Sequence, residues 1–176
     1  MTIQIWEVSG PERDALPALE RRFRVERRLR LTMRDGALAY EAAAVEPYKK
    51  LYPEPSLSGC TTFVAKTGQQ VVGRIDLSRH WTGFASIDDL VVAPADRGKG
   101  VGYALVRRAQ QWVVAAGLAG LRTETQDVNV TACSLYARCD FRLSGFDVDL
   151  YGASADSAGE IALFWYWRPP YSNPAG

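Results

Sequence analysis

The chain has 176 residues, a hydrophobic fraction of 47% and a formal net charge of +1. This length is that of one ordinary domain with a sizeable core, and the near-neutral charge gives no argument for nucleic acid or membrane partners. No run of ~18 apolar residues is present, and the N-terminal sequence lacks the basic and apolar segments of a signal peptide. We therefore expect a single-domain cytoplasmic protein over residues 1–176.

Cysteine and histidine content argues against disulfide and metal chemistry. Cys60, Cys133 and Cys139 are odd in number and lie in apolar or helical surroundings, so we expect reduced, buried thiols. His80 is the only histidine and cannot supply a multi-histidine site, and no CxxC or HExxH pattern occurs. We expect no metal.

The first third of the chain is predicted to be β-structure with a basic segment. Gln4–Val8 alternates as a short strand, and residues 29–45 are predicted to form two strands turned at Asp35-Gly36. The arginines of this region are expected to face solvent or to pair with acidic residues elsewhere in the fold, rather than to bind nucleic acid. These arginines are Arg21, Arg22, Arg24, Arg27, Arg28 and Arg30.

A loop, a hairpin and a further strand are predicted next. Glu46–Gly59 contains three prolines and is typical of a loop. Thr61–Lys66 and Val71–Leu77 flank a Thr67-Gly68 turn, which predicts a β-hairpin. Residues 85–92 (ASIDDLVV) are predicted to form a strand that stops before Pro94.

The pattern then changes to helical spacing. Apolar residues recur from Leu105 to Ala116, and Gly117 is a plausible C-terminal cap. Residues 118–126 are predicted to form a strand, and Asn129 opens a second predicted helix. Two more strands are predicted over 141–151 and 160–167, followed by a flexible tail over 168–176.

The glycine-rich turn after Pro94 is a candidate phosphate-binding site. A P-loop is excluded because no Ser or Thr follows Lys99. A dinucleotide-binding motif fits poorly, because it needs glycines spaced two and three apart near the first strand, whereas Gly98, Gly100 and Gly102 are spaced two and two and lie midway along the chain. The pattern present is R-x-x-G-x-G, from Arg97 to Gly102. Its glycines allow successive N–H groups to face one anion, and the following helix adds its positive dipole end. A plain strand-to-helix turn is the alternative.

The flanking residues narrow this prediction. Residues 90–102 (L-x-V-x-P-x-x-R-x-x-G-x-G) resemble the acetyl-CoA signature of the GNAT acyltransferase superfamily, and Asn129–Tyr136 resembles its second motif, which ends in a tyrosine. The resemblance implies an α/β (α+β) fold, with a central mixed, mostly antiparallel sheet flanked by helices in a three-layer sandwich. It also implies acetyl-CoA as co-substrate. The implied cofactor-binding residues are Leu90, Val91, Val92, Arg97, Gly98, Lys99, Gly100, Val101, Gly102, Tyr103 and Asn129.

Within the superfamily, residues 71–168 are similar to streptothricin (nourseothricin) acetyltransferases, on the segments VVGRIDLSRHWTGFASIDDL, ETQDVN and FWYWR. The resemblance implies acetylation of the β-lysine amine of a cationic antibiotic, and hence antibiotic resistance. The sequence departs from the pattern of these acetyltransferases at two places. The acidic insert of the family after its EPY segment is reduced here to Glu54, and Asp140 replaces a glycine. Aspartate tolerates the left-handed backbone conformation better than most residues.

Amine acetylation needs a general acid and a base. The resemblance makes Tyr136 the candidate acid, because a tyrosine hydroxyl with a reference pKa of ~10 is protonated at neutral pH; a core tyrosine is the alternative. Asp88, Asp89 and Glu124 are candidates for the base that deprotonates the amine, with structural carboxylates as the alternative in each case. Asp88 and Asp89 should point to opposite faces of one strand.

Aromatic residues divide between a predicted pocket and the core. Tyr48, Tyr52 and Trp81 lie in predicted loops, where their rings suit a cationic amine through cation–π attraction. Core packing is favoured for Trp165 and Trp167.

Rival functions remain at this stage. They are acetylation of another amine (a polyamine, an aminoglycoside or a protein N-terminus), acetyl-CoA binding without turnover, and RNA association through the arginines. The sequence does not fix the oligomeric state, and a homodimer is one alternative.

Overall fold

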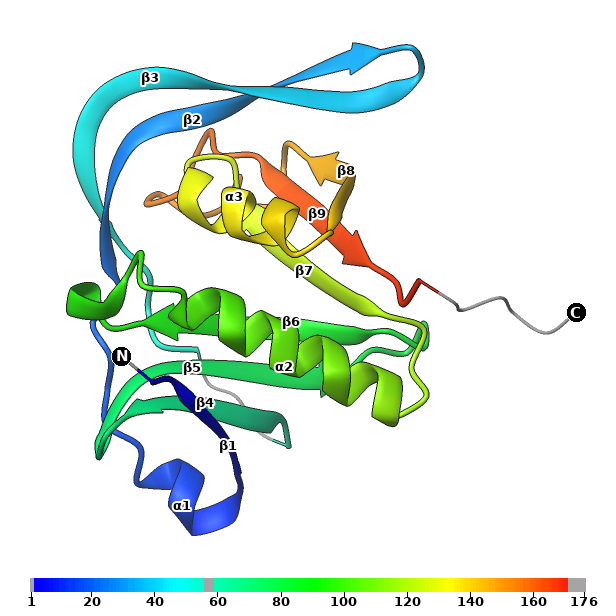
Figure 1. The fold of residues 1–176 in the computed structure, drawn as a ribbon. Helices are drawn as coiled ribbons and strands as arrows, with labels where there is room; N and C mark the ends of the chain where they lie inside the picture. The colour runs from blue at the N-terminus through cyan, green and yellow to red at the C-terminus, as the bar shows by residue number, and fades with distance from the viewer. Residues whose placement is uncertain (1, 56–58, 171–176) are drawn as a thin grey trace, which may run out of the picture. The chain divides into compact units, whose positions relative to one another are not determined.

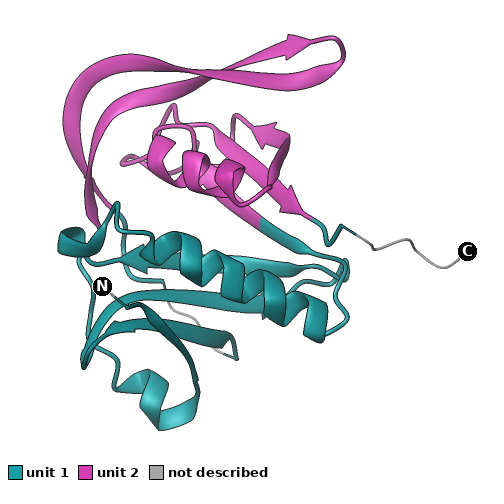
Figure 2. Cartoon of the chain, in the orientation of Figure 1, with its two compact units in different colours: residues 1–21, 52–122, 168–176 teal, residues 22–51, 123–167 magenta. Residues whose placement is uncertain are grey.

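The computed structural model describes residues 2–55 and 59–170. The chain divides into two compact units, which Figure 2 colours separately. Unit 1 comprises residues 1–21, 52–122 and 168–176, and unit 2 comprises residues 22–51 and 123–167. Each unit is therefore built from segments distant in sequence.

Unit 1 is an antiparallel sheet with helix α2 packed on one face (Figure 1). The strands are neighbours in the order β1-β4-β5-β6. Leu105, Ala109 and Val113 recur every four residues along α2 and are fully buried. The elements are β1 (Gln4–Val8), α1 (Gly10–Asp14), β4 (Thr61–Thr67), β5 (Gln70–Arg79), β6 (Ala85–Val92), η1 (Pro94–Asp96) and α2 (Val101–Ala115).

The contact between α2 and β5 depends on a glycine. A Cβ added at Gly73 would lie 2.8 Å from Cγ1 of Val101, closer than real Cβ atoms come, and 3.1 Å from Cδ1 of Leu105, which is tight. The absence of a side chain lets the first turns of α2 lie directly on the strand. The start of this helix is thereby fixed against the sheet, next to the glycine-rich turn.

Strand β6 contains a β-bulge. Asp76 of β5 pairs with Asp89, whereas Leu77 pairs with Ile87, so Asp88 is an extra residue on β6. A bulge bends the strand and redirects the side chain of the inserted residue. Two of the predicted site residues, Asp88 and Asp89, therefore lie at an irregular point of the strand.

Unit 2 contains a long hairpin and the C-terminal strands. Strands β2 and β3 pair antiparallel around Asp35 and Gly36, whose φ angles of 51° and 75° are those of a tight hairpin turn. The order of the other strands is β7-β9-β8. The elements are β2 (Arg22–Arg34), β3 (Ala37–Leu51), β7 (Leu121–Gln126, with its first two residues in unit 1), α3 (Val130–Arg138), β8 (Arg142–Asp147) and β9 (Ala162–Trp167).

Trp165 forms the centre of the core of unit 2. It is fully buried, its indole Nε1 donates a hydrogen bond of 3.0 Å to Oγ1 of Thr125, and the ring of Tyr40 meets it edge-on at 5.6 Å. A buried tryptophan with its N–H satisfied is a stable arrangement. The predicted core role of Trp165 is confirmed, and Trp167 is buried as well.

Several local predictions are confirmed. Asn129 caps α3, with its Oδ1 accepting a 3.2 Å hydrogen bond from the Ala132 N–H, and Gly117 (φ 64°) follows α2. Asp140 has a φ of 65°, the left-handed conformation expected where the family has glycine. The β4–β5 turn lies at Gly68–Gln69, one residue later than predicted.

Several boundaries were predicted wrongly: β2 begins at Arg22 rather than Leu29, and β7 begins at Leu121 rather than Leu118. The loop predicted over Glu46–Gly59 begins later, because β3 continues to Leu51 and pairs with β2 through Lys49 and Arg24. Pro47 is tolerated because the register of the two strands shifts beside it. The strand predicted over 141–151 ends at Asp147. Most of the predicted flexible tail, residues 171–176, lies outside the described residues.

Candidate active site

The glycine-rich turn of unit 1 has the backbone geometry that an anion site needs. Gly98 and Gly100 have φ angles of 77° and 87°, and Gly100 is the N-cap residue of α2. Apart from the adjoining residues, no atom of the described part of the chain lies within 4 Å of a Cβ built at either position, so the space above the turn is open. The first N–H groups of an α-helix have no partner within the helix and attract anions.

Arg97 fixes this turn to its surroundings. Its Nε donates a 3.0 Å hydrogen bond to the carbonyl oxygen of Val92, and its Nη2 donates one of 2.8 Å to the carbonyl oxygen of Glu20. The guanidinium therefore joins the end of β6 to the segment before β2. Lys99 lies 3.2 Å from the carboxylate of Asp96 on the exposed side of the turn.

Asp89 of β6 is held by two arginines. Nη1 and Nη2 of Arg21 donate to its two carboxylate oxygens at 2.8 and 2.5 Å, and Nη2 of Arg74 lies 3.4 Å away. Only 11% of the Asp89 side chain and 10% of the Arg21 side chain are exposed. A bidentate arginine–carboxylate pair of this kind is strong and geometrically specific. Asp89 is therefore an ion-paired carboxylate.

Asp88 differs from its neighbour. Its side chain is exposed, and it is hydrogen-bonded to Ser78 of β5. Desolvation by the surrounding protein raises the pKa of the Asp88 carboxyl; the negative charges of Asp76 and Asp89 act in the same direction, against Ser78 and Arg122. A carboxyl with a raised pKa is a better proton acceptor near neutral pH than an ordinary aspartate.

Asp76 of β5 is a buried carboxylate that was not predicted from the sequence. Asp76 is fully buried; its Oδ1 accepts a 2.6 Å hydrogen bond from the Thr62 hydroxyl, and its Oδ2 lies 2.9 Å from Nε of Arg74. Arg74 thus joins Asp76 and Asp89, and it also contacts Glu54 at 3.1 Å. The available signal was the Arg-x-Asp spacing on β5, which places both side chains on one face of the strand.

Unit 2 contains the remaining candidate catalytic residues and Asn129. Glu124 of β7 is exposed and accepts a hydrogen bond from the Tyr151 hydroxyl. Tyr136 of α3 is buried, and its ring lies 5.2 Å from that of Phe141. Because Oδ1 of Asn129 caps α3, a contact of Asn129 with a cofactor would use its NH₂ group. Tyr151 was missed, since the segment after β8 was predicted to be strand.

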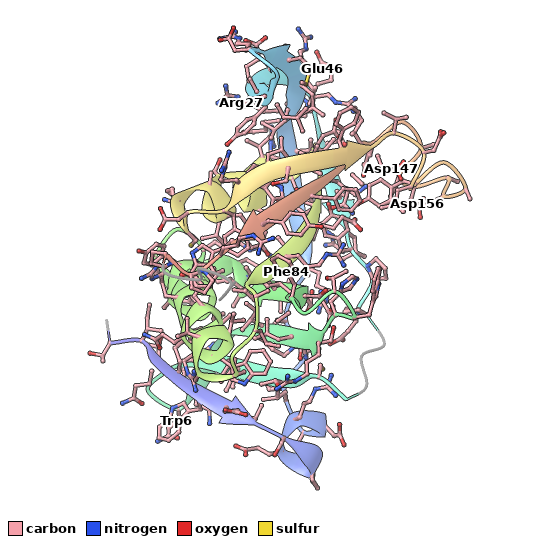
Figure 3. All side chains as sticks on the ribbon, turned by 90° about the vertical axis from the view of Figure 1, so that its right-hand side faces the viewer. Trp6, Arg27, Glu46, Phe84, Asp147 and Asp156 are labelled. Carbon is pink, nitrogen blue, oxygen red and sulfur yellow. The ribbon has the colours of Figure 1, made fainter. Side chains whose placement is uncertain are left out.

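The arginines of β2 and the segment before it are partly paired within the fold, as favoured from the sequence. Arg21 binds Asp89, and Nε of Arg28 donates a 2.9 Å hydrogen bond to Asp127. Arg24 pairs with Glu26 on the surface, and Figure 3 shows Arg27 on the same hairpin.

Of the predicted pocket aromatics, Trp81 is 90% exposed in the β5–β6 turn. Tyr48 lies on β3, where it is half-exposed, so its predicted loop position is wrong.

Within residues 2–55 and 59–170, no group of three or more His, Cys, Asp and Glu side chains is arranged to hold a metal. The three cysteines form no disulfide; Cys133 and Cys139 are buried, whereas Cys60 is partly exposed. Burial raises the pKa of the Cys133 thiol to about 11, which favours the protonated thiol at neutral pH. In the same part of the chain, every helix is too short or too polar to cross a bilayer.

Comparison with known proteins gives consistent matches. The profile of the acetyltransferase (GNAT) family matches residues 26–141. A streptothricin acetyltransferase of Escherichia coli is 36% identical over 150 residues, which cover 84% of this chain and 86% of that protein. Streptothricin acetyltransferase A of Bacillus subtilis is 36% identical over 130 residues, covering 70% and 75%. The chain belongs to the GNAT acetyltransferase family.

Solved structures agree with this assignment. An acetyltransferase of Bacillus anthracis, solved in complex with acetyl coenzyme A, has a TM-score of 0.88 at 30% identity and covers 96% of this chain and 100% of its own. A nourseothricin acetyltransferase has a TM-score of 0.81 at 29% identity and covers 97% and 100%. The α+β GNAT fold with a mixed, mostly antiparallel sheet and helices is confirmed, as is acetyltransferase chemistry with acetyl-CoA.

The residues of this GNAT protein fit the co-substrate in unit 1. The open, positive-φ turn at Gly98 and Gly100 precedes the N-terminus of a 15-residue helix, which suits a pyrophosphate. The Arg97 guanidinium donates hydrogen bonds to two backbone carbonyls, and the Lys99 ammonium pairs with the Asp96 carboxylate. Since both cations already have partners, an anion at this turn would be bound mainly by the backbone.

Proposed function

We propose that the protein acetylates the primary amine of the β-lysine arm of streptothricin-type antibiotics and thereby confers resistance. The observation that carries this proposal is the 36% identity to a streptothricin acetyltransferase over 84% of the chain. Acetylation replaces a cationic amine by a neutral amide, which removes a charge from the antibiotic. Since acetyl-CoA is a cytoplasmic metabolite, we place the reaction in the cytoplasm.

Asp88 is the proposed base. A primary amine with a pKa of ~10 is almost wholly protonated at pH 7, so its proton must be removed before it can attack a carbonyl carbon. Asp88 is exposed and has a raised pKa, whereas the Asp89 carboxylate is saturated by Arg21 and Arg74. Glu124, which is exposed and bonded to Tyr151, is the second candidate.

Acetyl-CoA supplies an activated acetyl thioester, and we propose the following roles in its use. Gly98, Gly100 and the N-terminus of α2 bind its pyrophosphate, together with the other residues of 97–103. The backbone of Leu90, Val91 and Val92 pairs with its amide groups and donates an N–H toward the acetyl oxygen. Tyr136 provides the proton that the departing sulfur needs, and the NH₂ group of Asn129 contacts the cofactor arm.

The test is a panel of amines incubated with purified protein and acetyl-CoA, with release of free thiol as the readout. The panel contains streptothricin, a polyamine, an aminoglycoside and a peptide with a free N-terminus. We expect the highest kcat/KM with streptothricin, and mass spectrometry should place one acetyl group on its β-lysine arm. Preference for another amine would reject the substrate, and no thiol release with any amine would favour acetyl-CoA binding without turnover.

A further inference from the structure

Arg21 is the arginine that joins the N-terminal segment of unit 1 to β6. It is the last residue of that segment, 68 positions from Asp89 in the sequence, and its two terminal nitrogens bind the two oxygens of that carboxylate. Nine-tenths of its side chain is buried. Arg21 thus places a full positive charge, almost excluded from solvent, next to the bulge at Asp88.

The charges around Asp88 come from three strands. Strand β5 contributes Arg74, Asp76 and Ser78, β6 contributes Asp89, and the start of β7 contributes Arg122. Asp76 is paired with Arg74 and, at 3.7 Å, with Arg13 of α1, and Arg74 is shared with Asp89 and Glu54. Without Arg21, Asp89 would keep only its 3.4 Å contact with the shared Arg74, and most of its negative charge would act on the neighbouring Asp88.

We propose that Arg21 is a positioning residue of the active site: by neutralising Asp89, it sets the charge environment in which the adjacent Asp88 accepts the proton of the substrate amine. This inference rests on the proposed role of Asp88. It assigns the two neighbouring aspartates of β6 different functions, with Asp88 as the base and Asp89 as the anchor of the arginine. A clamp that only holds the fold together is the alternative.

The pH dependence of kcat/KM separates these two roles. Loss of the arginine charge in Arg21→Met leaves Asp89 negative, which disfavours ionised Asp88 and moves the acid limb of the profile to higher pH. We expect a shift of roughly 0.5–1 pH unit, smaller than for a buried neighbour because Asp88 is exposed. Asp89→Asn should move the limb to lower pH. Arg21→Lys should stay near the wild type, and Arg21→Met/Asp89→Asn should return toward it.

The matched control is Arg24→Met, which removes an arginine of β2, three positions further along the chain, that pairs with Glu26 at the surface. It should leave the limb unchanged. Lower thermal stability of Arg21→Met with an unmoved limb would overturn the inference and leave only a structural clamp. If Arg21→Met does not fold, an unmoved limb in Asp89→Asn has the same meaning.

Asp88→Asn distinguishes the inference from the proposed function. If the acid limb persists in Asp88→Asn, the base assignment is wrong; if it disappears there but does not move in Arg21→Met, only the role of Arg21 is wrong. Titration of the Asp88 carboxyl by ¹³C NMR in the wild type and in Arg21→Met gives the same comparison without turnover. An Asp88 midpoint that is the same in both proteins would also overturn the inference.

Discussion

Each unit of the molecule contains a buried aspartate held by an arginine fork, and the two pairs have different surroundings. In unit 1, Arg21 holds Asp89 beside a β-bulge and the exposed carboxyl of Asp88. In unit 2, Arg28 holds Asp127, whose other carboxylate oxygen accepts a 3.1 Å hydrogen bond from the Ile161 N–H. Asp127 is fully buried, and its backbone N–H and C=O bond to Ile161 and Leu29.

Under the proposed function, the difference means that a buried ion pair does not by itself mark an active site. Asp127 joins β2 to the segment before β9, and the buried pair of Lys50 and Glu160 joins β3 to the same segment. Figure 3 shows Asp147 at the end of β8 and Asp156 in the segment between β8 and β9, which Lys50 contacts through the Asp156 carbonyl oxygen. What distinguishes Asp89 is the neighbouring carboxyl, Asp88, which is exposed and, among the residues that the structure describes, is hydrogen-bonded to Ser78 rather than held by two arginine nitrogens. The following variants test this distinction.

The largest expected effect is on stability in unit 2. Asp127→Ala leaves Arg28 without its carboxylate and the Ile161 N–H without its acceptor, so we expect the free energy of unfolding to fall by about 3–5 kcal/mol. Urea denaturation measures this. Arg24→Met, which breaks an exposed pair, should change it by less than about 1 kcal/mol. If the acid limb of the pH profile also moved in Asp127→Ala, the contrast between the two pairs would be lost.

Loss of the proposed general acid should affect turnover alone. Tyr136→Phe keeps the ring against Phe141 and removes only the hydroxyl, so we expect kcat to fall by about 10²-fold with an unchanged dissociation constant for acetyl-CoA. Steady-state kinetics and calorimetry measure the two quantities. Tyr40→Phe, in the same unit, should have wild-type kcat. A Tyr136→Phe enzyme with wild-type kcat at every pH would make Tyr136 a core residue.

Much of this arrangement was predictable because its signals are local. The glycine turn, the Asn129 cap and the Asp35-Gly36 hairpin each depend on a few consecutive residues whose backbone preferences are known. The left-handed conformation of Asp140 was also predicted from a single substitution. The family motifs added the co-substrate, which composition and periodicity alone do not identify.

The unpredicted features depend on distant partners. Arg21 meets Asp89 across 68 positions, Arg28 meets Asp127 across 99, and Lys50 meets Glu160 across 110. No local pattern chooses which arginine pairs with which carboxylate. The bulge at Asp88 was hidden for the same reason, because it is defined by the register against β5. Consequently, the different environments of Asp88 and Asp89 required the structure.

A smaller effect is expected at the glycine turn. Gly100→Ala forces alanine to a φ of 87°, which costs roughly 1–2 kcal/mol, and it should raise the KM for acetyl-CoA about tenfold by displacing the N–H groups that face the pyrophosphate. Gly68→Ala is the matched control, because Gly68 also has a positive φ of 59° and open space around its Cβ. It should lose similar stability and keep the wild-type KM. Equal KM values in both variants would remove the turn from the acetyl-CoA site.

The smallest expected effect is at Tyr151, and it tests which unit supplies the base. The Tyr151 hydroxyl orients the Glu124 carboxylate, so Tyr151→Phe should lower kcat/KM by about threefold, in line with the loss of one exposed hydrogen bond of about 0.5–1.5 kcal/mol. If Tyr151 acts only through Glu124, the same substitution should have no effect in a Glu124→Gln background. Additive losses would assign Tyr151 a role of its own. If Glu124→Gln loses the acid limb of the pH profile and Asp88→Asn keeps it, the base is Glu124 of unit 2. The arginine-bound aspartates of both units would then have structural roles only.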